Sequence, residues 1–178
     1  MLLNLTLLES DFERALAHEA GHAVVGLSLG AFIEHIERAS ASGMPGSLMS
    51  QGFDEGLCVQ FEPTIKTFEP RFQYTVAAAG MAAERLVFGR FEPIAASHDV
   101  DLLRAAGRTD IEILGLIDIA QKVLSENVSF LDFVRQSLKN RPSWLGPILV
   151  DGSILNERFR SEGVKVDISV DLEKLLPG

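Results

Sequence analysis

The chain has 178 residues, 47% hydrophobic and 23% charged, which suits one globular domain with a sizeable core. Its formal net charge of −9, with no basic stretch to offset it, argues against a nucleic-acid partner. The single cysteine, Cys58, excludes an internal disulfide and a zinc site built from cysteines. We therefore expect one domain over residues 1–178, with Cys58 as a small apolar side chain in a strand.

The N-terminus MLLNLTLLESDFERA is apolar but lacks the basic segment and the small-residue cleavage site of a secretory signal. The longest nearly uncharged stretch, residues 20–33, is too short and too rich in glycine to span a bilayer. The sequence therefore predicts a cytoplasmic protein without membrane insertion.

The first predicted element is a helix over residues 11–29. Ser10 followed three residues later by Glu13 is the pattern of a capping box, which marks a helix start. Gly30 is suited to end the same helix, because glycine adopts the left-handed conformation of a helix C-terminus at little cost.

Two short strands are expected next, over residues 32–38 and 56–62. In GLCVQFE the apolar side chains Leu57, Val59 and Phe61 alternate with polar ones, which is typical of a half-buried strand at a sheet edge. Residues 39–55 are rich in Ser, Gly and Met and are predicted to form a loop. That composition permits the loop to move over a site as a lid.

The second half of the chain is predicted to be mainly helical. Pro70 begins a helix that runs to residue 88, with Gly89 behind it, and its centre AAAGMAA lets a neighbouring helix approach closely. Helices follow over residues 99–140, broken at Gly107 and Asn127, and over residues 148–160. The segment VKVDISV fits either a strand or an extended arm. Together these elements predict an α+β fold that is mostly α-helical, with a small sheet and a C-terminal helical part.

The sequence HEAGH at residues 18–22 indicates a metal site. His18 and His22 are four residues apart, so on a helix both imidazoles lie on one face, one turn apart. Glu19 projects beside the point that both rings face, where it reaches a metal-bound water without binding the ion. This H-E-x-x-H pattern is the arrangement of zinc peptidases, with two ligands and a general base on one turn.

A catalytic zinc needs a third protein ligand and an open position for water. The longer pattern HExxHxxGxxH is absent, so the third ligand must come from further along the chain. The candidates by residue type are His35, Glu84, His98, Asp99 and Asp101.

Several segments in the same order resemble the peptidase domain of the FtsH family of AAA zinc metalloproteases. HEAGHAVV at 18–25 is similar to that family's zinc-binding helix, and GMAAERLVFG at 80–89 is similar to its small-residue helix. VDLLRAA at 100–106 resembles the segment that carries the family's third zinc ligand. Weaker similarity at 120–138 and 149–155 extends the resemblance over residues 11–155.

The resemblance implies a zincin-like HExxH helix packed on a small-residue helix, with one Zn²⁺ per chain. It maps the third zinc ligand onto Asp101, with His98 as the alternative ligand or as a helper for the oxyanion. It also fits Glu84 as a hydrogen-bonding partner of a ligand histidine, although a plain surface or helix-capping role fits equally well. His35 is more typical of a solvated strand face.

The chain departs from the family because it contains no GxxxxGK[ST] phosphate loop, so no ATPase module is expected. The sequence therefore predicts an ATP-independent zinc metallopeptidase that cleaves peptides or unfolded protein segments. Glu19 would act as general base, and substrate would pair with the edge of strand 56–62. A separate ATPase or a homo-oligomer is a further expected partner.

Two other functions fit the same motif. One is a catalytically silent zinc-binding interaction module derived from the FtsH peptidase domain. The other is a zinc hydrolase that acts on a non-peptide amide. The presence of Glu19 favours an enzyme, because a structural zinc site needs no general base and is normally closed by a fourth protein ligand.

Overall fold

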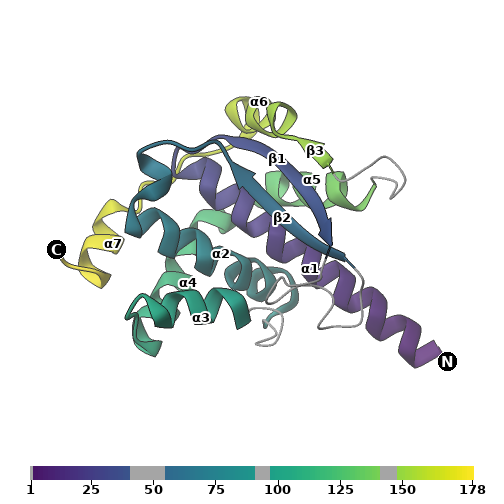
Figure 1. The fold of residues 1–178 in the computed structure, drawn as a ribbon, viewed down its shortest axis with the longest axis horizontal. Helices are drawn as coiled ribbons and strands as arrows, with labels where there is room; N and C mark the ends of the chain where they lie inside the picture. The colour runs from purple at the N-terminus through teal and green to yellow at the C-terminus, as the bar shows by residue number, and fades with distance from the viewer. Residues whose placement is uncertain (1, 41–54, 91–96, 141–147) are drawn as a thin grey trace.

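The computed structural model describes residues 2–40, 55–90, 97–140 and 148–178. These residues form seven α-helices, one short 3₁₀ turn and a sheet of three strands (Figure 1). The predicted α+β class, mostly helical with a small sheet, is confirmed. The predicted loop over residues 39–55 lies outside the described residues except at its ends, where 39–40 belong to the strand Ile33–Ser40 and 55 to the strand Glu55–Phe61.

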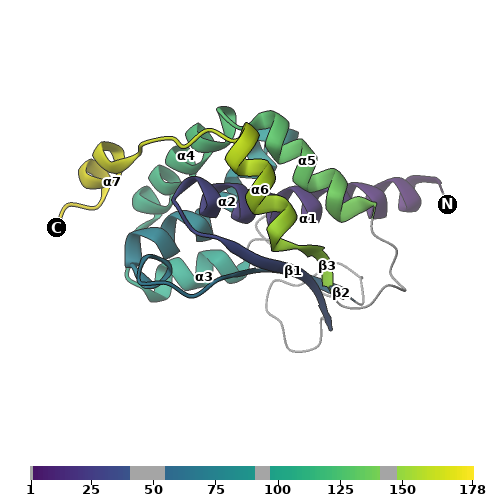
Figure 2. The same ribbon diagram turned by 90° about the horizontal axis from the view of Figure 1, so that it is seen from above.

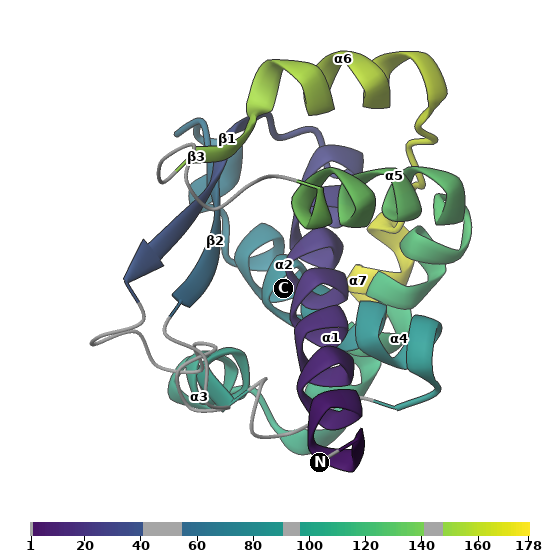
Figure 3. The same ribbon diagram turned by 90° about the vertical axis from the view of Figure 1, so that its right-hand side faces the viewer.

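Helix α1 (Leu2–Ser28) runs through the middle of the fold. The sheet lies on one side of it and helices α4 and α5 lie on the other (Figure 3). Its end is as predicted, since Gly30 has a φ of 96° and its backbone N–H bonds back to the carbonyl of Leu27.

The start of α1 differs from the prediction of a capping box at Ser10. The helix already begins at Leu2, and its first turns project beyond the body of the protein (Figures 1 and 2). The leucine-rich residues before Ser10 are good helix formers and continue the helix upstream. Glu13 forms ion pairs with Arg135 and Lys139, so its carboxylate links α1 to α5 (Val128–Lys139).

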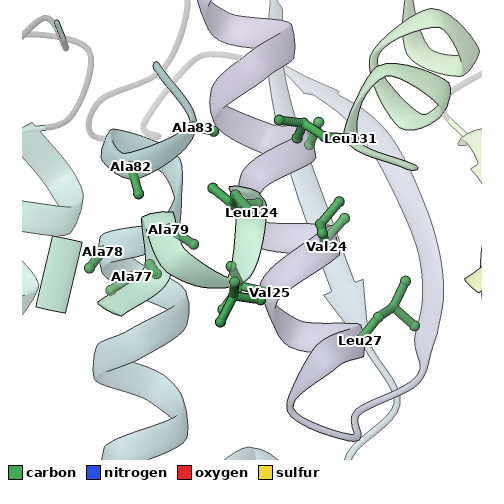
Figure 4. Close-up of a cluster of buried hydrophobic side chains, with 14 of the residues drawn as sticks. Val24, Val25, Leu27, Ala77, Ala78, Ala79, Ala82, Ala83, Leu124 and Leu131 are labelled. Carbon is green, nitrogen blue, oxygen red and sulfur yellow. The ribbon is translucent and has the colours of Figure 1, made fainter. Parts of the chain in front are cut away.

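Helix α2 (Pro70–Phe88) has the predicted bounds, with Gly89 in the left-handed conformation at its end. The expected close packing on α1 is also confirmed. A Cβ atom added to Gly21 would lie 2.5 Å from the carbonyl oxygen of Ala79. The small side chains of α2 lie beside Val24 and Val25 of α1 and Leu124 of α4 (Figure 4).

The sheet has the strand order β2-β1-β3 and is antiparallel throughout. Strand β1 (Ile33–Ser40) is central, and β2 (Glu55–Phe61) is an edge strand, as predicted. A register shift between Ile33 and His35 allows both Ile33 and Ile36 to be buried, although their odd spacing would otherwise put them on opposite faces.

Strand β3 (Ile148–Asp151) corrects the prediction of a helix over 148–160. The strand pairs with β1 and fills the other edge of the sheet. The sequence could not decide this, because a short apolar run such as Ile148, Leu149, Val150 suits either a strand or a buried helix. Asp151 then accepts a hydrogen bond from the backbone N–H of Ser153 and caps helix α6 (Gly152–Glu162).

The remaining helices follow the predicted breaks. Helix α3 (Ser97–Ala105) ends before Gly107, which has a φ of 84°, and α4 (Asp110–Ser125) begins with a capping box at Thr109. Asn127 precedes α5 (Val128–Lys139).

The C-terminal tail forms no strand. It runs without regular structure over residues 163–168 and then forms a short helix, α7 (Ser169–Leu175), which packs on α4. Among the described helices none is both long enough and apolar enough to cross a membrane.

Candidate metal centre

The two histidines of HEAGH lie on one face of α1, as their spacing predicts. Their ring centroids are 4.8 Å apart and the ring planes meet at 83°. His18 is buried, whereas the side chain of His22 keeps 13% of its exposure. The pair therefore lies at the border between the helix interface and solvent.

Helix α2 fixes the orientation of both rings through their Nδ1 atoms. The Nδ1–H of His22 donates to the carbonyl oxygen of Val76 at 2.6 Å, and the Nδ1–H of His18 donates to Oε2 of Glu84 at 2.9 Å. Because a carbonyl oxygen accepts but does not donate, the proton of His22 lies on Nδ1. Both Nε2 atoms are thereby left for other partners, which is the arrangement of metal-binding histidines.

Asp99 at the start of α3 completes the group. Its Oδ2 lies 2.7 Å from Nε2 of His18 and 3.4 Å from Nε2 of His22. The three ligand atoms all lie within 4.8 Å of one another, so His18, His22 and Asp99 form a group that could hold a metal ion. Two imidazole nitrogens and one carboxylate oxygen make a donor set that suits zinc.

The assignment of the third ligand to Asp101 is corrected by this geometry. Asp101 is exposed on α3, and Asp99 takes the position expected for it. Two residues along a helix correspond to a rotation of roughly 200°, so the two carboxylates point in nearly opposite directions. His98, the alternative ligand or oxyanion helper, is also exposed and is no member of the group.

Glu84 fulfils the expected role of hydrogen-bonding partner. Its side chain is completely buried on α2, and one carboxylate oxygen accepts from His18. A glycine of α2, Gly80, also affects the position of His18. A Cβ atom at Gly80 would lie 2.4 Å from Cε1 and Nε2 of His18, so the imidazole occupies space that only a glycine leaves open.

The positive charge of a protonated His18 and the negative charges of Asp99 and Glu84 stabilise one another. Burial alone lowers the pKa of His18, but hydrogen bonds to Asp99 and Glu84 outweigh it and hold that pKa well above its usual value. Burial likewise raises the pKa of Asp99, yet the charge of His22 and the hydrogen bond from His18 bring it well below its usual range. With its pKa raised, His18 can donate from both ring nitrogens, from Nδ1 to Glu84 and from Nε2 to Asp99.

Glu19 lies beside the group and is not one of its ligands. Its side chain is half-buried, and this burial raises the pKa of its carboxyl group despite the opposing effect of His22 and His18. Glu19 also lies close enough to β2 for its charge to help raise the pKa of Cys58, although burial is the larger cause. The Glu19 carboxylate is therefore close enough to interact electrostatically with both the group and the edge strand.

His35 lies on strand β1 in a different cluster, where it is half-buried. Its Nε2 lies 3.1 Å from Oε2 of Glu37 on β1, and Gln60 of β2 donates to Glu37 and Cys58. These side chains share one face of the sheet, because His35 pairs with Gln60 and Glu37 pairs with Cys58. Among the described residues these side chains do not form a group that could hold a metal ion.

Sequence reasoning missed two contributors to the centre, Val76 and Gly80. Val76 acts through its backbone carbonyl, for which the side chain gives no signal. Gly80 could have been suspected, because a glycine in a helix interior is costly and often marks a close approach of another group.

Comparison of the chain with protein-family models found no match, and comparison with curated proteins found none either.

Proposed function

We propose that the chain is an FtsH-like zinc metallopeptidase domain that cleaves peptide bonds in peptides or unfolded protein segments without ATP. The observation that carries this proposal is the convergence of His18, His22 and Asp99 with Glu19 beside them as a carboxylate outside the ligand set. Three protein ligands is the number that catalytic zinc sites use, since such sites keep one position open.

The residues fit zinc by their chemistry and by their accessibility. His22 and Asp99 keep 13% and 15% of their side-chain exposure, so the group is not sealed from solvent. When bound, zinc supplies Lewis acidity, which lowers the pKa of a coordinated water and stabilises negative charge on a carbonyl oxygen.

Glu19 supplies the proton transfer. The carboxylate accepts a proton from the attacking water and later donates it to the amine that leaves. Its raised pKa suits this role, because a general base works best when its pKa approaches the working pH. A carboxylate whose pKa stayed at its usual value would be a weaker base and would accept the proton of the water less readily.

The edge strand β2 supplies a surface for an extended substrate. One side of β2 pairs with β1, and no strand among the described residues pairs with the other side. Unpaired N–H and C=O groups of an edge strand bind an extended peptide through main-chain hydrogen bonds. Such binding places little demand on substrate sequence and requires an unfolded segment.

The proposal is tested with the wild-type protein and Glu19→Gln, matched for zinc content by elemental analysis. Hydrolysis of a fluorescent, permanently unfolded casein is followed in both, with small amides as a second substrate set. We expect cleavage of casein by the wild type and at least a roughly 100-fold loss in Glu19→Gln, the usual effect of removing a general base. Zinc binding in both proteins without cleavage by either would instead support a silent zinc-binding module, and cleavage of small amides alone would support a non-peptide hydrolase.

A further inference from the structure

Arg14 is a buried cation one helical turn before His18 on α1. Its relative exposure is 8%, although arginine is rarely buried without a compensating charge. It is four residues from His18, so both side chains lie on the face of α1 that packs against α2.

The C-terminal end of α2 holds the guanidinium in place. Nη1 of Arg14 donates to the carbonyl oxygen of Arg90 at 3.1 Å, and its Cζ lies 4.7 Å from the ring centroid of Phe88. The end of a helix carries partial negative charge, and the face of an aromatic ring attracts cations, so both contacts favour a positive charge here.

The buried carboxylate of Glu84 is stabilised by a positive charge nearby. One of its oxygens accepts from His18, while Oε1 is buried and makes no hydrogen bond to any described residue. Arg14 places a second cation beside the carboxylate, with Nη1 4.0 Å from this oxygen. A buried carboxylate with an unsatisfied oxygen is costly, and an opposite charge at this distance offsets part of that cost.

We propose that Arg14 is a positioning residue of the metal centre, which holds the Glu84 carboxylate against Nδ1 of His18 and thereby keeps Nε2 aimed at the metal. The inference rests on the proposed metal site and not on peptidase activity. Arg14 touches neither the ligand atoms nor Glu19 in the described contacts, so its effect passes through Glu84 alone.

The test measures zinc affinity by competition with a chromophoric chelator, with the visible spectrum of the Co²⁺-loaded protein as a second readout. Arg14→Gln removes the charge but keeps a donor for the carbonyl of Arg90. We expect zinc affinity to fall about tenfold, the lower end of the 10- to 100-fold range for partners of ligand histidines, and the Co²⁺ spectrum to shift. Arg14→Lys keeps the charge and is expected to restore most of the affinity.

Arg135→Gln is the matched control. Arg135 also lies over the Phe88 ring, at 5.9 Å, but it pairs with Glu13 and Asp132 and does not reach Glu84. We expect Arg135→Gln to leave zinc affinity unchanged, although it removes packing against Phe88 as Arg14→Gln does. An equal loss of affinity in both variants would overturn the inference, because it would assign the effect to packing around Phe88.

A double-mutant cycle separates positioning from general stability. In the Glu84→Gln background, Arg14→Gln is expected to cause no further loss of zinc affinity, whereas a full tenfold loss there would overturn the inference. If Arg14→Gln does not fold, Arg14→Lys decides the question. Affinity within about threefold of the wild type would support the inference, and a loss as large as that of Glu84→Gln would overturn it. A wild type that binds no zinc would overturn the metal site itself and this inference with it.

Discussion

Two regions of the described residues combine histidine with carboxylates, and only one of them forms a group that could hold a metal ion. On α1 and α3, His18, His22 and Asp99 bring three ligand atoms within 4.8 Å. On the sheet, His35 and Glu37 lie beside Cys58 but form no such group among the described residues.

The difference comes from what lies behind each histidine. Both imidazoles on α1 donate from Nδ1 to α2, to Val76 and Glu84, which leaves Nε2 directed at one point. His35 uses its Nε2 for Glu37 two residues away on the same strand. Histidine and carboxylate content alone therefore does not make a metal site, and a partner that fixes the ring from behind is also needed.

The largest expected effect comes from the ligands themselves. Asp99→Asn removes the charged oxygen of a proposed ligand. Loss of a hydrogen-bonding partner of a ligand lowers metal affinity by up to roughly 100-fold, and we expect a larger loss here. Asp101→Asn on the same helix and His35→Ala on the sheet are expected to leave affinity unchanged. Chelator competition measures all three, and an affinity loss in Asp101→Asn would reverse the assignment of the third ligand.

A smaller but still large effect is expected from Gly80→Ala, which tests whether the site depends on the close approach of α2. The new Cβ would lie 2.4 Å from Nε2 of His18, so the ring must move away from its position. We expect weaker zinc binding and a free energy of unfolding lower by about 1–3 kcal/mol, as for other overpacked interfaces.

Gly115→Ala is the control for this change. Its added Cβ would meet the end of the Leu175 side chain at 2.6 Å, on α4 and away from the metal centre. Thermal denaturation and zinc titration of both variants should show a loss of stability in each and a loss of affinity only in Gly80→Ala. Retained affinity in Gly80→Ala would mean that the imidazole has room to shift without losing the ion.

The pH dependence of zinc binding follows from the raised pKa of His18. Zinc must displace the proton through which Nε2 of the charged His18 donates to Asp99, so affinity falls as pH decreases. Because that pKa lies above the usual value of about 6.5, the fall should begin at a higher pH than for an ordinary histidine site. Affinity measured between about pH 6 and 8.5 should drop up to tenfold per unit for each proton displaced. An affinity that stays constant over this range would contradict the raised pKa of His18.

The smallest effect is expected at Cys58, on the sheet cluster. Burial, with the charges of Glu19 and Glu37, raises the pKa of this thiol from 9.0 to about 11. Alkylation of the folded protein by iodoacetamide near neutral pH should therefore be about 100-fold slower than that of the unfolded chain, in proportion to the thiolate present. Cys58→Ser is expected to leave zinc affinity intact. Fast alkylation in the folded state would show that the thiol is more exposed than the structure describes.

The sequence alone was enough for features set by local patterns. The helix over residues 70–88, the end of α1 at Gly30 and the breaks at Gly107 and Asn127 all depend on residues whose backbone preferences act within a few positions. The shared face of His18 and His22 follows from helical geometry in the same way. The small residues of α1 and α2 also predicted the close packing of these two helices, because only short side chains permit it.

The tertiary structure decided what depends on distant partners. Whether Asp99 or Asp101 faces the histidines depends on the rotation of α3 about its axis, and packing against α2 fixes that rotation. The run at 148–151 became a strand because β1 had an edge open to it, which no local pattern reveals. Glu84, Val76 and Arg14 likewise gain their roles from the contact of α1 with α2, since hydrogen bonds and charges act across space between residues far apart in the chain.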